Sequence, residues 1–151
     1  MTTKREIDEF LAQKTLAIVG ASRSGKKFGN TILKELTRAG YRLLPVHPEA
    51  PEVDGVRAFP SFAALPEPVG GVIIVVPPAQ AESVVKDAAA HGIRRVWLQQ
   101  GAGSDEAIKF CQDNGISVVH GECVLMYPKP ATAWIHGAHR WVWDLLGRTP
   151  K

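Results

Sequence analysis

The chain has 151 residues, a net charge of +3 and 45% hydrophobic residues. A chain of this length buries about 68–70% of the surface that its unfolded form exposes, so it needs no metal or disulfide to hold its fold. Its basic residues are spread along the sequence instead of forming the stripe with interleaved aromatic residues that is typical of nucleic-acid-binding proteins. The composition therefore excludes a disordered chain and argues against nucleic acid as a partner.

The beginning of the chain, MTTKREIDEF, lacks the apolar segment of a signal peptide, and no run of about 18 apolar residues follows. The two cysteines, Cys111 and Cys123, belong to a chain too large to need a disulfide, which favours free thiols in a reducing compartment. We therefore expect a cytoplasmic protein that does not enter a membrane.

Short runs rich in Val and Ile alternate with stretches of helical period, as in sheets of parallel strands joined by helices. The predicted strands are 15–19, 41–46, 71–76, 95–99 and 116–120. The predicted helices are 5–13 at the start and 27–39, 79–91 and 104–114 between strands. Gly40, Gly92 and Gly115 follow the last three helices, where glycine ends a helix without steric cost.

The strand sequences TLAIV and GVIIVV are apolar throughout, which predicts that helices cover both faces of the sheet. We therefore predict a Rossmann-like, doubly wound α/β fold: a mostly parallel five- or six-stranded sheet in three layers, forming one domain over 1–151. The proline-rich segment 47–68 replaces one crossover helix by a loop, with a short strand at 56–58.

The end of the chain predicts an amphipathic helix at about 132–146. Trp134, Trp141 and Trp143 give this helix more apolar weight than a solvated tail carries. We expect it to pack on an edge of the sheet, and a contact between two copies of the chain is the alternative. Association with a membrane surface comes third, because Arg140 and Arg148 alone do not make a basic face.

The loop between the first strand and the first crossover helix reads GASRSGKKFGN, from Gly20 to Asn30. Doubly wound sheets bind phosphates at this position, against the amides of the helix. The GxxxxGK pattern of a nucleotide-hydrolysing loop is incomplete, because Lys27 stands where Ser or Thr would hold magnesium. The later strands also end without the acidic residue that such an enzyme requires.

A nicotinamide-dinucleotide loop fits the sequence poorly. Ser22 stands where the GxGxxG pattern has its second glycine, and the second strand is followed by His47 and Pro48 instead of Asp or Glu. The alternative function is an oxidoreductase or a redox-sensing regulator that binds NAD(P) in the same crevice.

A loop of small residues with cations around it predicts an anion site. The residues are Gly20, Ala21 and Ser22, then the cations Arg23, Lys26 and Lys27, then Gly29 and Asn30 opening the helix. Cations in a first helical turn oppose the helix dipole by about 0.3–1 kcal/mol each, and a bound polyanion reverses that effect. The alternative is that these are ordinary solvated surface charges.

Several stretches resemble one family in order and spacing: AIVGAS followed by FGN, then PVHP, VIIVVPP, VWLQQG and ECVLM, within about 14–127. The sequence resembles the CoA-binding domain proteins, small relatives of the CoA-binding part of succinyl-CoA synthetase. The resemblance implies a protein that binds coenzyme A or an acyl-CoA and does not transform it, because the chain ends before the synthetase's catalytic parts.

The same resemblance implies where the ligand lies. The pyrophosphate would lie near Gly20, Ala21 and Ser22, with the cations reaching its phosphates. His47 and Pro48, together with Val76, Pro77 and Pro78, would wall the adenosine or the pantetheine arm. Glu49 departs from the family, whose members often carry lysine near this position, and a carboxylate beside a polyanion weakens binding.

Four metal-ligand side chains follow in the order HxxC and HxxH: His120, Cys123, His136 and His139. The spacing suits tetrahedral zinc, but the surrounding strand and helix are not a zinc-finger hairpin. We therefore expect no metal site there, and Cys123 is most simply a buried small hydrophobic residue.

Overall fold

The computed structural model describes residues 3–22, 24–25 and 27–126. Its strands are β1 (Thr15–Val19), β2 (Arg42–Val46), β3 (Glu52–Val53), β4 (Val56–Arg57), β5 (Gly71–Ile74), β6 (Arg95–Gln99) and β7 (Ser117–Glu122). Its α-helices are α1 (Lys4–Leu11), α2 (Phe28–Arg38), α3 (Pro78–Ala90) and α4 (Asp105–Asp113). Two short 3-10 helices, η1 (Phe62–Ala64) and η2 (Val124–Met126), complete the described elements.

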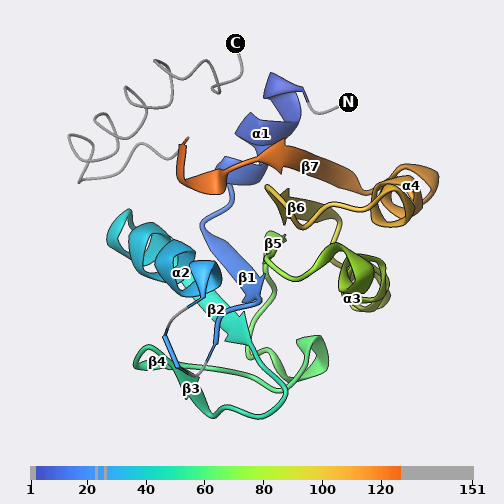
Figure 1. Cartoon of the computed structure of the whole chain (residues 1–151). Coiled ribbons are helices and arrows are strands. Elements are labelled where there is room, and N and C mark those ends of the chain that lie inside the picture. The colour runs from blue at the N-terminus through green and yellow to red at the C-terminus, as the bar shows by residue number, and fades with distance from the viewer. Residues whose placement is uncertain (1–2, 23, 26, 127–151) are drawn as a thin grey trace.

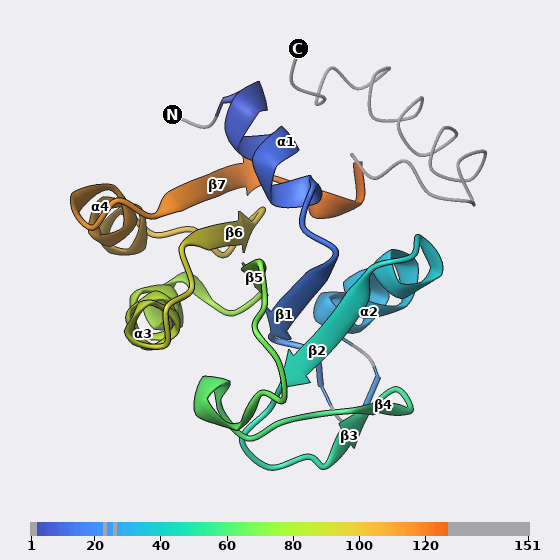
Figure 2. The same cartoon turned by 180° about the vertical axis from the view of Figure 1, so that it is seen from behind.

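Five strands form one parallel sheet in the order β2-β1-β5-β6-β7 (Figures 1 and 2). The chain runs from β1 to one side, into β2, and then crosses back to add β5 on the other side of β1. The strand order therefore reverses at β1, and in open α/β sheets ligands bind outside the carboxyl ends of the strands at such a reversal.

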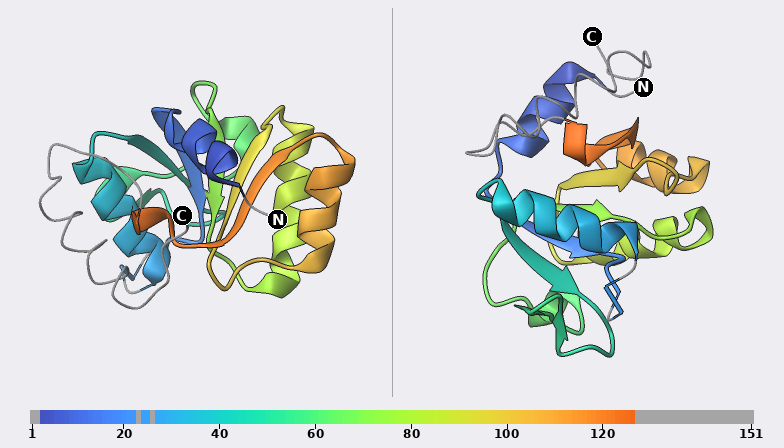
Figure 3. Two further views of the ribbon diagram at one scale, coloured as in Figure 1. Left: turned by 90° about the horizontal axis from the view of Figure 1, so that it is seen from above. Right: turned by 60° about the vertical axis from the view of Figure 1, so that its left-hand side comes forward.

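Helices cover both faces of the sheet, as the apolar strands predicted (Figure 3). Leu16 and Ile18 of β1 pack in one core cluster with residues of α1 and α2. Ala17, which points to the other face, packs in a second cluster with residues of α3 and α4. The predicted Rossmann-like three-layer α/β fold is confirmed, with five strands in the sheet.

The predicted helix ends are confirmed. Gly40, Gly92 and Gly115 have φ angles of 98°, 83° and 68°. Positive φ costs glycine little, so each helix stops within a residue or two of the expected position. The strand 116–120 instead runs from Ser117 to Glu122. Leu98 pairs with His120 and Gln99 with Glu122, so Gly121 is an extra residue in β7 and pairing continues beyond the expected end.

The connection from β2 to β5 contains a hairpin, β3–β4, and the short helix η1 in place of a crossover α-helix. The short strand predicted at 56–58 therefore exists as β4, but it has an unforeseen partner in β3. Phe59 attaches this connection to the sheet through a bridge to Val46 and two backbone hydrogen bonds of 2.8 and 2.9 Å.

The helix predicted at 132–146, with its tryptophans, lies outside the described residues. In the part of the chain that the structure describes, the helices are too short or too polar to cross a bilayer.

Candidate functional site

The loop after β1 begins at Gly20, in contact with the segment that follows β5. Gly20 has a φ of 117°, and a Cβ there would collide with the carbonyl oxygen of Val75. Only glycine allows both this conformation and this approach. The predicted loop therefore lies directly against the end of the neighbouring strand, at the point where the strand order reverses.

The first turn of α2 presses against the same loop. A Cβ on Gly29 would lie 2.7 Å from the carbonyl oxygen of Gly20 and 2.9 Å from the backbone nitrogen of Ala21. Gly29 is buried and has a helical conformation, so its need for glycine comes from this approach alone. Glycines at such positions let a helix and a phosphate-binding turn pack closely in dinucleotide-binding folds.

Asn30 fastens the loop to the helix. Its side chain is almost fully buried, with 1% exposure. The Ser22 amide donates to Asn30 Oδ1, and Asn30 Nδ2 donates both to Ser22 O and to Asp54 Oδ2, each at 2.8 Å. Because one acceptor and two donors are all matched, the orientation of the amide group is fixed. Asn30 was predicted to touch the ligand, but its amide group is engaged with the loop.

Lys27 is the N-cap residue of α2, and its exposed side chain makes no capping hydrogen bond. Phe28 and Gly29 follow at the first two helical positions, whose N–H groups have no acceptor within a helix. The amino end of α2 therefore presents backbone donors and a lysine on the loop side, an arrangement suited to an anion. Phe28 itself is 48% exposed, the one large hydrophobic residue so exposed in the described part of the chain.

His47 has a structural contact that the sequence did not reveal. Its Nδ1 accepts hydrogen bonds from the amides of Glu49 and Ala50 at 3.1 and 2.9 Å, so the ring closes the turn after β2. In this arrangement Nδ1 carries no proton, and a neutral ring carries its proton on Nε2. Pro48 and Glu49 are exposed in the same turn, which lies at the carboxyl edge of the sheet with the loop 20–30.

The residues after β5 also lie at this edge. Val76 is half-buried, and Pro77 and Pro78 are exposed. Pro77 is the N-cap residue of α3 and Pro78 its first residue, a position that proline favours because its missing N–H would have no partner there. The structure therefore gives these two prolines a role in starting α3 in addition to the predicted wall.

Two of the predicted cations, Arg23 and Lys26, lie outside the described residues, as do His136 and His139. Within 3–22, 24–25 and 27–126, no group of three or more His, Cys, Asp or Glu side chains could hold a metal ion. Burial lowers the pKa of His120, and the nearby carboxylates of Glu6 and Glu122 oppose that shift.

Both cysteines are buried free thiols, as expected. Burial raises the pKa of Cys111 to about 11. A thiol with a raised pKa is a poor nucleophile at neutral pH, because the thiolate is the reactive form. Cys111 is therefore a structural residue between α4 and the sheet.

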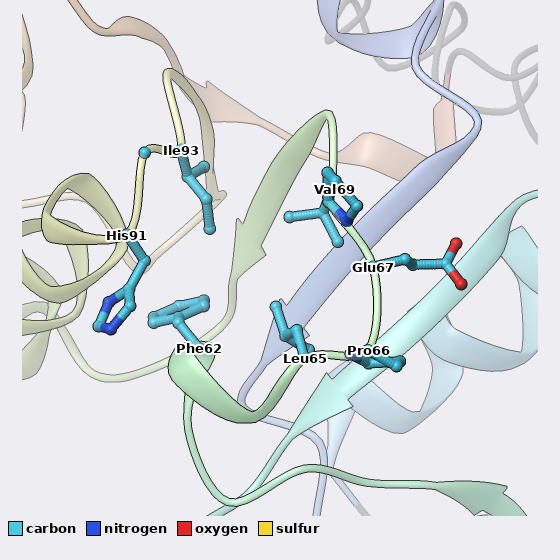
Figure 4. Close-up of a pocket in the computed structure, with 9 residues that line it drawn as sticks. Phe62, Leu65, Pro66, Glu67, Val69, His91 and Ile93 are labelled. Atoms are coloured by element: carbon cyan, nitrogen blue, oxygen red, sulfur yellow. The ribbon is translucent and has the colours of Figure 1, made fainter.

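A cavity of about 420 Å³ opens at the opposite edge of the sheet, where β5 and β6 begin. Its lining residues are Phe62, Leu65, Pro66, Glu67, Pro68, Val69, His91, Gly92 and Ile93. Figure 4 shows the apolar side chains facing one another, while Glu67 points away from them. Glu67 is instead paired with Arg42 through two contacts of 3.0 Å. The cavity is therefore separate from the loop 20–30.

The sequence reasoning missed Asp54 and Phe28. Asp54 lies at the tip of the β3–β4 hairpin and reaches Asn30 from a distant part of the chain. The signal for it was present, because Asp-Gly between two valines is a strong hairpin sequence. The sequence pointed less clearly to Phe28, whose only signal is an aromatic side chain beside a lysine at the first position of a helix.

The parallel sheet, its reversal at β1 and the glycine-dependent loop define a Rossmann-like α/β protein. The sequence from 14 to 128 matches the CoA binding domain family. The chain belongs to this family, and the expected resemblance is confirmed.

Relatives of known sequence or structure agree with this membership. A conserved hypothetical protein from Pyrococcus furiosus is 37% identical, with a TM-score of 0.69, covering 74% of this chain and 96% of that one. The uncharacterized protein YneT of Bacillus subtilis is 28% identical over 81% of this chain and 91% of its own length. The alpha subunit of an ADP-forming acetate–CoA ligase II from Pyrococcus furiosus is 26% identical over 78% of this chain, which spans 28% of that subunit.

Proposed function

We propose that the protein binds coenzyme A or an acyl-CoA at the loop 20–30 and releases it chemically unchanged. The observation that carries this proposal is the close packing of Gly29 on Gly20, which brings the amino end of α2 against the loop at the strand reversal. Membership of the CoA binding domain family supports coenzyme A as the polyanion.

The charges and donors of the loop fit a pyrophosphate. Lys27 and the first amides of α2 lie together at the amino end of the helix, where the helix dipole favours negative charge. Val75, which lies against Gly20, and the half-buried Val76 that follows it would supply an apolar wall for the uncharged pantetheine arm.

The relatives support a binding role. The ADP-forming ligase subunit is matched over 28% of its length, so the matched part is a fraction of that enzyme. We propose that this fraction binds coenzyme A and that ligation belongs to the remainder. A carrier or a sensor of coenzyme A is the corresponding role for the present chain.

Calorimetric titration with coenzyme A, dephospho-CoA, NAD and NADP tests the ligand. We expect coenzyme A to bind more tightly than either nicotinamide dinucleotide. Tighter binding of NAD would overturn the proposal in favour of the dinucleotide alternative.

A separate assay tests whether the ligand is transformed. The protein is incubated with acetyl-CoA, and free thiol is followed with a chromogenic disulfide reagent. We expect thiol release at the rate of the buffer alone. Faster release that increases with protein concentration would show that the protein acts on its ligand, without affecting the conclusion about binding.

A further inference from the structure

The tip of the β3–β4 hairpin is held at a fixed place beside the loop. Asp54 and Gly55 connect Val53 to its partner Val56, and their φ angles are 51° and 78°. Two positive φ angles in a two-residue connection are those of a type I′ turn, which Asp-Gly favours. Val53, with 1% exposure, belongs to the core cluster on the α2 face and anchors the hairpin.

The Asp54 side chain is hydrogen-bonded to Asn30 and lies near Gly25 of the loop. Its Oδ2 accepts a hydrogen bond of 2.8 Å from Asn30 Nδ2, on the helix side. Its Oδ1 would lie 3.0 Å from a Cβ placed on Gly25, in the middle of the loop. The Gly25 amide in turn donates to Ser22 O at 3.2 Å.

Asn30 transmits this contact to the loop backbone. Its amide group holds both the N–H and the carbonyl oxygen of Ser22, and its remaining N–H has Asp54 as acceptor. A buried amide that loses one acceptor is driven to reorient or to admit water, because an unsatisfied buried donor is unfavourable. Removing the Asp54 side chain therefore loosens the two bonds that fix Ser22.

We propose that Asp54 is a positioning residue, which keeps Ser22 and the amino end of α2 in their binding conformation by holding the amide group of Asn30. This role rests on the proposed function, in that the loop is the coenzyme A site. The negative charge of Asp54 opposes a bound polyanion. Asp54 therefore favours binding through its hydrogen bond to Asn30 and its position in the hairpin, not through its charge. A loop that is ordered before binding spends less of its interaction energy on ordering.

Two substitutions separate the hydrogen bond from the charge. Asp54→Gly removes the side chain, and Asp54→Asn keeps an acceptor oxygen while removing the charge. Glycine and asparagine both tolerate the positive φ of this turn, so neither change strains the hairpin. Glu52→Gln, an exposed residue of the same hairpin, is the matched control for loss of one negative charge.

The first measurement is hydrogen exchange of the Ser22 amide in the ligand-free protein. We expect exchange at least about tenfold faster in Asp54→Gly than in the wild type, because local opening governs exchange. Asp54→Asn and Glu52→Gln should exchange like the wild type. Unchanged Ser22 exchange in Asp54→Gly would overturn the proposal, whatever the protein binds.

The second measurement is the Kd for coenzyme A. We expect about tenfold weaker binding in Asp54→Gly, the size of a modest loss of preorganisation, and wild-type or tighter binding in Asp54→Asn. Equal weakening in both variants would overturn the proposal, because Asp54→Asn keeps an acceptor for Asn30. If coenzyme A fails to bind the wild type while Ser22 exchange responds as expected, the proposed function fails and the positioning role stands.

Discussion

Gly29 in the first turn of α2 lies so close to Gly20 at the end of β1 that a single methyl group would not fit between their backbones. The atoms that such a methyl group would meet belong to the main chain, so no side chain can rotate away. The helix and the loop must separate to admit it.

Gly29→Ala should therefore destabilise the fold by about 1–3 kcal/mol, the usual cost of overpacking, and weaken coenzyme A binding. Chemical denaturation measures the first effect and calorimetry the second. Gly103→Ala is the control, because its Cβ would meet its nearest neighbour at an ordinary 3.8 Å. Equal stability of the two variants would contradict the close approach.

Lys27→Glu should weaken coenzyme A binding by about 1–3 kcal/mol, the value of a hydrogen bond to a charged group. The stability of the ligand-free protein should instead rise slightly, because a carboxylate favours the amino end of a helix. Lys34→Glu makes the same charge change at an exposed position further along α2. An unchanged Kd in Lys27→Glu would remove this lysine from the site.

Phe28 is half exposed beside Lys27, where an aromatic ring is available to a purine base. Phe28→Ala should weaken coenzyme A binding by about 1–3 kcal/mol, the range measured for base stacking on aromatic side chains. Binding of 4′-phosphopantetheine, which lacks the base, should be unaffected. Phe28→Tyr, which keeps the ring, is the control. Equal losses for both ligands would show that Phe28 acts through the loop.

Cys111 should react slowly with thiol reagents at pH 8. A pKa of about 11, against 9.0 for an ordinary thiol, reduces its thiolate about 100-fold. The raised pKa also lowers stability at high pH. As pH rises from 9 towards 11, the unfolded chain releases the thiol proton before the folded chain does, so the free energy of unfolding falls. Labelling followed by peptide mapping tests the reactivity, with the protein in denaturant as control. Rapid native labelling would contradict the buried thiol.

The alternation of strands and helices was predictable because its signals are local. β1 and β6 were predicted residue for residue, since apolar runs and glycine stops depend only on nearby sequence. The position of the loop after β1 was predictable for the same reason, whereas its binding of an anion stays a prediction. The order of the strands in the sheet follows from long-range pairing, which no short stretch encodes.

The inner connections of the site were not predictable from local patterns. Asn30 read as a ligand contact, yet its amide group is bonded to Ser22 and Asp54, the latter 24 residues away. His47 read as a wall of the pocket, yet its ring nitrogen accepts from the turn that follows it. The role of Asn30 depends on where the hairpin β3–β4 lies in space, whereas the contact of His47 is made within its own turn.

No crossover α-helix joins β2 to β5 in the described chain, so a proline-rich connection covers part of the sheet in place of a helix. There, Phe62 of the short helix η1 and Leu65 after it pack in the core cluster that elsewhere contains residues of α3 and α4. A segment held by few backbone hydrogen bonds opens locally at a lower free energy than an α-helix does. Among the residues that the structure describes, a protease added to the native protein should therefore cut first within 60–69, before the sheet itself unfolds.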